Sequence, residues 1–317
     1  MIEAAADLSV SIVLEVSVCS SSDRLNHLRS TCPVQNHTVT EWLETQSLTQ
    51  LRQWTSSWLV DDKHQFLACL HWKVGSTTWQ AILCNNSSPR PIKPYQRFFQ
   101  LCLRKTGIKR LSEQTFSKED IISRLLSYYK IMVVRHPLDR LVSTWIDKFQ
   151  NPKEYDHTFI EKYGRELLRK YRPTLPREIQ QQGYGVYFSE MIQYIVEGHK
   201  NGHWDGPYSL KCHPCELPFN RLVKLETFSE DVPSIVTNHL QGRGGTTAIN
   251  RQGKGKWSKN FQKTVMNYNN ISDNYFDAMK KKYALDFEQF GYGVERKQNG
   301  RTVMHCRVEM GGGRACC

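Results

Sequence analysis

The 317-residue sequence contains no run of about 20 apolar residues, the length that a membrane-spanning helix requires. The stretch at 8–18, LSVSIVLEVSV, is apolar but too short, and Glu15 interrupts it. The 19 glycines follow no repeat, and the chain is 39% apolar and 23% charged. These features exclude a polytopic membrane protein, a collagen-like chain and a wholly disordered chain. They are typical of one large or two small globular domains.

Acidic residues are too few to balance the basic ones. There are 31 Asp and Glu against 43 Lys and Arg, which gives a net charge of +12. Residues 93–135 hold ten basic and three acidic residues, and residues 251–263 hold five basic and none acidic. This charge favours an anionic partner: nucleic acid, an acidic polysaccharide, a phosphorylated cofactor or an anionic membrane. No standard nucleic-acid-binding motif accompanies it, so nucleic acid is the least favoured.

The N-terminus lacks the basic start of a signal peptide. Residues 8–18 predict a strand or a poorly ordered end rather than a membrane anchor, with a missing true N-terminus as an alternative. Many cysteines and four N-x-[ST] sequons nevertheless favour the secretory pathway. The sequons begin at Asn36, Asn85, Asn86 and Asn270, and the ten cysteines are Cys19, Cys32, Cys69, Cys84, Cys102, Cys212, Cys215, Cys306, Cys316 and Cys317.

Short apolar runs between about 60 and 292 predict a mixed α/β fold. Residues 66–70 and 130–134 have the pattern of buried parallel strands, each followed by a turn and a helical pattern. Residues 221–225 predict a further strand. Ser189 and Ser272 are the predicted N-caps of two further helices.

Two of these strand–turn–helix segments are candidate phosphate-binding sites. In HWKVGSTTWQAIL, 71–83, small residues allow backbone N–H groups to approach an anion, a helix N-terminus adds positive potential, and Lys73 adds a full charge. It is not a Walker A motif. In IMVVRHPLDRLVSTWIDKF, 131–149, Arg135 at the strand end and Ser143 on the following helix would contact a phosphate. Alone, each segment fits an ordinary structural turn equally well.

The cysteine pair CHPC at 212–215 has three interpretations. A zinc half-site lacks a second pair at suitable spacing, a redox pair is an alternative, and a structural disulfide is preferred, either within the pair or to a distant cysteine. Cys84 and Cys102 are a further candidate pair. The basic run at 251–261 is either part of an anion site or a solvated loop.

The order and spacing of the two phosphate-binding candidates resemble the cofactor motifs of the Golgi carbohydrate sulfotransferases. The branch that contains the chondroitin and dermatan 4-O-sulfotransferases and the natural-killer-epitope sulfotransferase is the most similar. The segments YGVYFSEMIQYI, HWDGPYSLKCHPC, LVKLETFSEDV and YALDFEQFGY also match that branch in its order, so the resemblance covers about 59–292. It implies the P-loop-like sulfotransferase fold, with a central parallel sheet flanked by helices.

The resemblance also implies a cofactor site for 3′-phosphoadenosine 5′-phosphosulfate (PAPS), with no metal. The 5′-phosphosulfate would bind Trp72, Lys73, Val74, Gly75, Ser76, Thr77 and Thr78. The 3′-phosphate would bind Arg135, His136, Pro137, Leu138, Asp139, Arg140, Leu141, Val142 and Ser143. Where the family usually has Pro, Cys, Asn and a basic residue, this chain has Trp72, Ser76, Thr78 and Gln80.

Sulfuryl transfer, treated by analogy with phosphoryl transfer, needs charge on the leaving group and a base at the acceptor hydroxyl. Lys73 is predicted to stabilise the leaving group, and His203 is the first candidate for the base. The other candidate bases are His157, His136, Glu190 and Glu226.

The predicted function is therefore carbohydrate O-sulfotransfer, with O-4 of N-acetylgalactosamine in a chondroitin- or dermatan-type acidic glycan as acceptor. The alternative is a non-catalytic glycan- or heparin-binding relative. By resemblance, the protein is a type II membrane glycoprotein of the Golgi lumen. The predicted domains are a stem-like or poorly ordered segment, 1–58, a sulfotransferase domain, 59–292, and a tail, 293–317.

Overall fold

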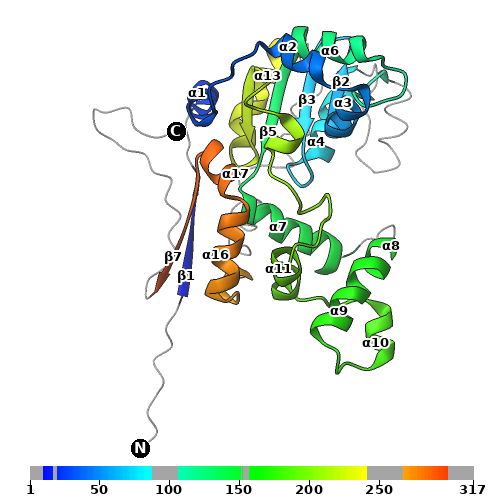
Figure 1. Ribbon diagram of the computed structural model, residues 1–317, viewed down its shortest axis with the longest axis vertical. Helices are drawn as coiled ribbons and strands as arrows, with labels where there is room; N and C mark the ends of the chain where they lie inside the picture. Colours follow the sequence, from blue (N-terminus) through cyan, green and yellow to red (C-terminus); the bar gives the residue numbers. More distant parts are fainter. Residues whose placement is uncertain are drawn as a thin grey trace, which may run out of the picture.

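The computed structural model describes residues 10–16, 20–87, 106–150, 152, 157–240 and 267–298, and for 10–16 and 295–298 the backbone alone. Two hydrophobic cores organise these residues: one surrounds a β-sheet, and the other lies among helices beside it. In Figure 1 the sheet and its helices lie above, and the second group of helices lies below.

The sheet contains β2 (Trp58–Asp61), β3 (Phe66–Leu70), β4 (Lys109–Arg110), β5 (Tyr129–Val134) and β6 (Arg221–Lys224), in the order β4-β2-β3-β5-β6. The predicted parallel sheet is confirmed for β3, β5 and β6. β2 pairs antiparallel with both β3 and β4. The four residues between β2 and β3 explain this, because a parallel connection needs a much longer crossover.

Helices cover both faces of this sheet and form the part beside it (Figure 1). Those packed around the sheet are α1 (Ser21–Thr31), α2 (Val39–Thr45), α3 (Leu48–Trp54), η1 (Thr55–Ser57), α4 (Ser76–Ser87), α6 (Lys118–Ser127), α12 (Ser209–Cys212), η5 (Leu225–Thr227), α13 (Phe228–His239) and α17 (Ala284–Gln289). Those of the second core are α7 (Pro137–Trp145), η2 (Ile146–Gln150), α8 (His157–Phe159), η4 (Ile160–Gly164), α9 (Arg165–Tyr171), α11 (Phe188–Val196) and α16 (Asp273–Lys282), and α10 (Arg177–Gln182) packs on the outside of α9 and η4.

A two-stranded ribbon projects from this body (Figure 1). It pairs β1 (Val10–Val16) antiparallel with β7 (Tyr292–Gln298). The prediction of a strand within residues 8–18 is therefore confirmed.

Residues 20–57 pack against the sheet. Leu25, Leu28, Leu43 and Leu51 are buried in its core, and Ser21 accepts a hydrogen bond from the backbone N–H of Leu222 in β6 at 3.0 Å. This packing differs from the stem-like or poorly ordered segment expected for 1–58. The boundaries proposed at 58 and 292 stay predictions.

Two disulfides join the CHPC segment to distant parts of the chain. Cys32 bonds Cys215, and Cys69 in β3 bonds Cys212. Both cysteines of the CxxC pair are thereby used, so the zinc half-site and the redox pair are wrong, and the distant-disulfide interpretation is confirmed. Cys84 is also disulfide-bonded. Cys102 and the basic run at 251–263 lie outside the described residues.

One predicted helix start is correct and one is wrong. Ser272 is the N-cap of α16, as predicted. The other helix, α11, begins at Phe188, so Ser189 is not its N-cap. Its first turn is fixed instead by Glu190, whose carboxylate accepts the backbone N–H of Tyr187 at 2.7 Å.

Candidate functional site

The two candidate phosphate-binding segments meet at one edge of the sheet. β3 and β5 are parallel neighbours, so the turns that follow Leu70 and Val134 leave from the same edge. Ligands of α/β proteins commonly bind at this carboxyl edge. The guanidinium of Arg135 donates a hydrogen bond to the backbone carbonyl of Lys73 at 3.0 Å. Residues 62 positions apart thus form one site.

The turn after β3 has the backbone shape of an anion-binding loop. Lys73 and Gly75 both have positive φ, of 68° and 81°. A Cβ on Gly75 would lie 3.0 Å from the Leu225 side chain, so glycine suits both the conformation and the space. The N–H groups of Thr78 and Trp79 donate to the Gly75 carbonyl at 2.9 and 3.1 Å and start α4. The N–H groups of Ser76 and Thr77 come before these bonds, in the first turn of α4, where the helix offers them no carbonyl acceptor.

Trp72 takes the position where the family usually has proline. Its backbone N–H donates to Nδ1 of the buried His71 at 2.7 Å, a bond that proline would not make. This local hydrogen bond holds the turn without the ring of a proline.

The Lys73 side chain is paired with an acid that the sequence analysis missed. Its Nζ lies 2.9 Å from Oδ2 of Asp147 in η2. Burial lowers the pKa of the Lys73 ammonium, and Asp147 opposes that shift. Helical spacing could have indicated Asp147 as a site residue. It follows Ser143 by four residues and therefore lies on the same face of the helix.

Arg135 is buried and rigidly held. Its Nε donates to Oδ2 of Asp139 at 2.6 Å, and its backbone N–H donates to the Tyr208 hydroxyl at 3.0 Å. Burial disfavours the guanidinium charge, but the Asp139 carboxylate outweighs this and raises the pKa of Arg135.

Ser143 lies between these two ion pairs along one side of the α7–η2 helix. Asp139, Ser143 and Asp147 follow each other at intervals of four residues, which places them on one helical face. Asp139 contacts Arg135 and Asp147 contacts Lys73. Ser143 is half-buried and lies one helical turn from each of these two acids.

Most other residues of the two predicted cofactor segments are buried and support the site structurally. Arg140 is fully buried, and it donates to Nδ1 of His71 at 3.1 Å and lies 4.0 Å from Asp286. The side chains of five further residues are buried: Val74, Pro137, Leu138, Leu141 and Val142. Of the first segment, Ser76 and Thr78 are half-buried and Thr77 is exposed, at the start of α4.

His136 caps α7 and uses both ring nitrogens. Its Nδ1 accepts the Leu138 N–H at 3.3 Å, and its Nε2 lies 3.1 Å from the Gly293 carbonyl, to which it donates. Its backbone N–H donates to Glu226 at 2.7 Å. Burial lowers the pKa of His136 to about 4, so the ring is neutral near neutral pH.

This pKa predicts a loss of stability in acid. The unfolded state binds a proton on His136 below its ordinary pKa of 6.5, whereas the folded state stays neutral down to about 4. Stability therefore falls as the pH falls through this window, by about 2 kcal/mol between pH 7 and 4.5. Urea unfolding at both pH values should show a smaller pH dependence for His136→Asn, whose side chain retains the capping acceptor. An unchanged pH dependence would contradict a neutral buried His136.

The candidate bases occupy different surroundings. Glu190 is paired with Arg172 at 2.6 Å, and Glu226 accepts from the hydroxyl of Tyr292 at 3.0 Å as well as from His136. The His203 ring lies beside Trp72, with ring centroids 4.5 Å apart. Among Glu190, Glu226 and His203, it is His203 whose side chain contacts Trp72, the residue next to Lys73.

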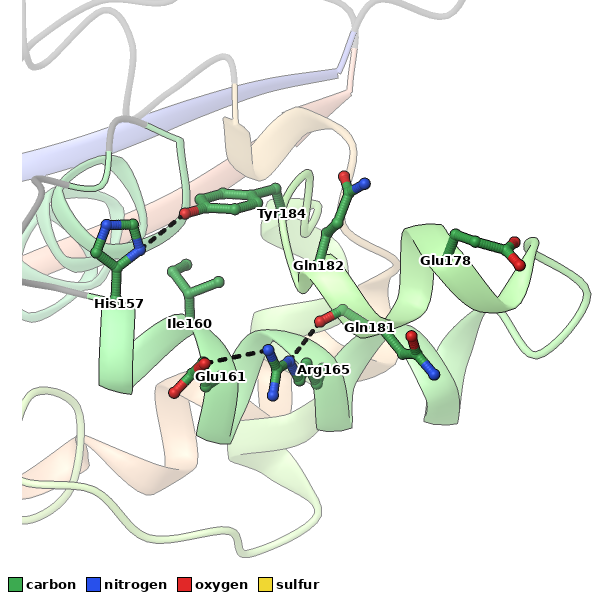
Figure 2. Close-up of a pocket in the computed structure, with 8 residues that line it drawn as sticks. All are labelled: His157, Ile160, Glu161, Arg165, Glu178, Gln181, Gln182 and Tyr184. Atoms are coloured by element: carbon green, nitrogen blue, oxygen red, sulfur yellow. Dashed lines mark hydrogen bonds and ion pairs between the residues drawn. The ribbon is translucent and has the colours of Figure 1, made fainter.

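His157 belongs to a separate cavity of about 420 Å³. Figure 2 shows its ring directed at the hydroxyl of Tyr184, 3.2 Å away, with Glu161 paired to Arg165 below. The remaining lining residues are Ile160, Glu178, Gln181 and Gln182. These contacts give His157 a local partner within the cavity rather than a contact to the Lys73 turn.

Within the described part of the chain, no group of three or more His, Cys, Asp or Glu side chains is arranged to hold a metal ion. None of the helices there has the length and apolar character needed to cross a membrane.

The structure is an α/β fold with two cation-bearing turns at the carboxyl edge of its sheet, and comparison with known proteins identifies the class. The model of the sulfotransferase family matches residues 56–293. The chain therefore belongs to the sulfotransferase family and is a sulfotransferase, and this family implies PAPS as the sulfate donor.

Curated relatives agree with this assignment. Carbohydrate sulfotransferase 11 of Rattus norvegicus is 29% identical over 248 residues, which cover 74% of this chain and 67% of the relative. Carbohydrate sulfotransferase 14 of Danio rerio is 28% identical over 312 residues, 96% of this chain and 77% of the relative. Carbohydrate sulfotransferase 8 of Mus musculus is 33% identical over 180 residues, 54% of this chain and 40% of the relative. No solved structure matches significantly.

Proposed function

We propose that this protein transfers a sulfuryl group from PAPS to a hydroxyl of an acidic glycan. The observation that carries the proposal is the hydrogen bond from Arg135 to the Lys73 carbonyl, because it unites two cationic segments at the carboxyl edge of the sheet. The names of the relatives support a carbohydrate as acceptor.

The donor set fits a bisphosphorylated nucleotide. The Lys73 ammonium, the first amides of α4 and the hydroxyls of Ser76 and Thr77 would hold the 5′-phosphosulfate. Arg135 and Ser143 would hold the 3′-phosphate. Gly75 leaves the turn without a side chain that would crowd an anion, and the N-terminus of a 12-residue helix adds positive potential.

PAPS supplies the sulfuryl group and a phosphate leaving group. The sugar hydroxyl oxygen forms a bond to sulfur, the bond from sulfur to the leaving phosphate oxygen breaks, and the hydroxyl proton passes to a base. In the proposed site Lys73 stabilises the charge that develops on the leaving oxygen, and His203 accepts the proton. Asp147 orients the Lys73 ammonium before the substrate binds.

We further propose N-acetylgalactosamine O-4 of a chondroitin- or dermatan-type glycan as the acceptor, and the Golgi lumen as the location, with a type II anchor. The disulfides Cys32–Cys215 and Cys69–Cys212 support an oxidising compartment. The similarity to carbohydrate sulfotransferases 11 and 14 supports a glycan acceptor without fixing the sugar.

Sulfate transfer from labelled PAPS tests the proposal. The acceptors to compare are desulfated chondroitin, desulfated dermatan and a glucuronate-terminated oligosaccharide, with binding of adenosine 3′,5′-bisphosphate measured in parallel. We expect bisphosphate binding and transfer to at least one acceptor. A folded protein that binds the glycans but transfers no sulfate would instead support the non-catalytic alternative, and the position of the label on the sugar would decide the O-4 assignment.

A further inference from the structure

Trp72 is a large aromatic side chain that remains half exposed beside the proposed transfer site. Its relative exposure is 50%, whereas Trp54, Trp58, Trp79 and Trp204 are buried. Single exposed apolar side chains are common on protein surfaces and need no explanation by themselves. Trp72 differs because it is fixed in place and immediately precedes Lys73.

One backbone hydrogen bond and two side-chain neighbours fix Trp72. The backbone of Trp72 is tied to His71 at 2.7 Å, and the His203 ring lies 4.5 Å from the indole between centroids. Gly202 lies close to the indole nitrogen, because a Cβ at that position would be 3.2 Å from Nε1. An aromatic group that is already ordered loses little conformational entropy when it binds a ligand.

The segment under the indole is fixed in turn. The backbone N–H of His203 donates to the side-chain oxygen of Asn201 at 2.8 Å. The Thr144 hydroxyl of α7 lies 3.2 Å from the His203 carbonyl. The indole and His203 are therefore held by α7, the helix that also carries Asp139 and Ser143.

We propose that the exposed part of Trp72 stacks on the apolar C–H face of a pyranose ring of the acceptor glycan. This inference rests on the proposed sulfotransfer to a glycan and adds the subsite that receives the sugar. A pyranose has an apolar face and a polar rim, and an indole offers a flat apolar surface with one polar edge. Stacking would leave the sugar hydroxyls at the rim directed toward Lys73 and His203.

Trp72 belongs to the segment expected to bind the 5′-phosphosulfate, but the contact of its indole with His203 favours a sugar over the nucleotide as the ligand of this side chain. The proposed bisphosphate site extends from Lys73 toward Arg135 and Ser143 along α7. Trp72 lies on the other side of Lys73 in the chain and contacts His203, the proposed acceptor base. The indole therefore lies beside the residue proposed to act on the acceptor hydroxyl.

Kinetics of Trp72→Ala and Trp72→Phe test the subsite. We expect Trp72→Ala to raise the KM for the glycan about tenfold and Trp72→Phe to raise it less, since one lost aromatic contact of this kind is worth about 1.4 kcal/mol. The affinity for adenosine 3′,5′-bisphosphate should fall much less than the affinity for the glycan, because both variants keep the backbone hydrogen bond of residue 72 to His71. Tyr187→Ala is the matched control, because Tyr187 is 60% exposed and lies in the cap of α11.

Each outcome decides the proposal. An unchanged glycan KM in Trp72→Ala overturns it, and so does an equal loss of bisphosphate affinity, which would assign the indole to the nucleotide. If the wild type transfers no sulfate, the proposed function fails, and calorimetric titration with desulfated chondroitin then decides the subsite alone. Weaker glycan binding in Trp72→Ala than in the wild type and Tyr187→Ala supports the subsite, and equal binding overturns it.

Discussion

Replacing Lys73 by alanine is expected to lower kcat/KM for sulfate transfer by about 10²- to 10³-fold, the usual cost of removing one preorganised charge-stabilising group. The ammonium is the cation carried by the turn at the carboxyl end of β3, and Arg135 anchors that turn through its carbonyl. The loss should fall on kcat more than on the KM for the glycan, because the developing charge on the leaving oxygen is greatest in the transition state.

The fold should tolerate Lys73→Ala. Asp147 loses one cation but has Lys148 at 3.6 Å, and it is about a quarter exposed. Lys63→Ala, an exposed lysine in the turn between β2 and β3, controls for the loss of one positive charge. Activity near that of the wild type in Lys73→Ala, with unfolding midpoints unchanged in both variants, would remove Lys73 from the proposed mechanism.

The parts of the fold that the sequence predicted well are those with a strong local pattern. The strands predicted at 66–70, 130–134 and 221–225 are rich in apolar residues, with FLACL apolar throughout, and they form the parallel part of the sheet. The helix after Arg135 has an apolar stripe and begins with Pro137, a residue suited to a first helical position. In each case the local pattern of apolar residues, together with the length of the segment and its flanking residues, indicates the element.

Relations between distant residues could not be predicted in this way. The partners of Cys212 and Cys215 lie 143 and 183 residues away, and the four cysteines allow three pairings. The choice depends on where the folded backbone brings Cα atoms within 5.4 to 5.9 Å. No local pattern contains that information.

The same limit applies within the candidate site. The sequence suggested Lys73, Arg135 and Ser143 because each stands at a strand end or on the following helix. It did not suggest that Asp147 would pair with Lys73 or that Arg140 would be fully buried against His71. Arg135 and Arg140 belong to one segment and are both buried. Only the three-dimensional packing shows that Arg135 contacts the Lys73 turn, whereas Arg140 contacts His71.

Arg135→Ala should both destabilise the protein and weaken nucleotide binding. Removing one partner of a buried ion pair costs about 3–5 kcal/mol, and Arg135 and Asp139 have side-chain exposures of 7% and 3%. The variant also loses the hydrogen bond that holds the Lys73 carbonyl. The affinity for adenosine 3′,5′-bisphosphate should fall by about 10- to 100-fold, the value of a charge-assisted hydrogen bond to phosphate.

The double variant Arg135→Ala/Asp139→Asn separates these two effects. Neutralising residue 139 removes the buried negative charge, so urea unfolding should recover part of the lost stability. Bisphosphate binding should not recover, because it depends on the guanidinium itself and on the Lys73 turn that it holds. Arg177→Ala, at an exposed arginine of α10, should change neither quantity. If binding returned together with stability in the double variant, Arg135 would act only through the fold, and the 3′-phosphate would need another cation.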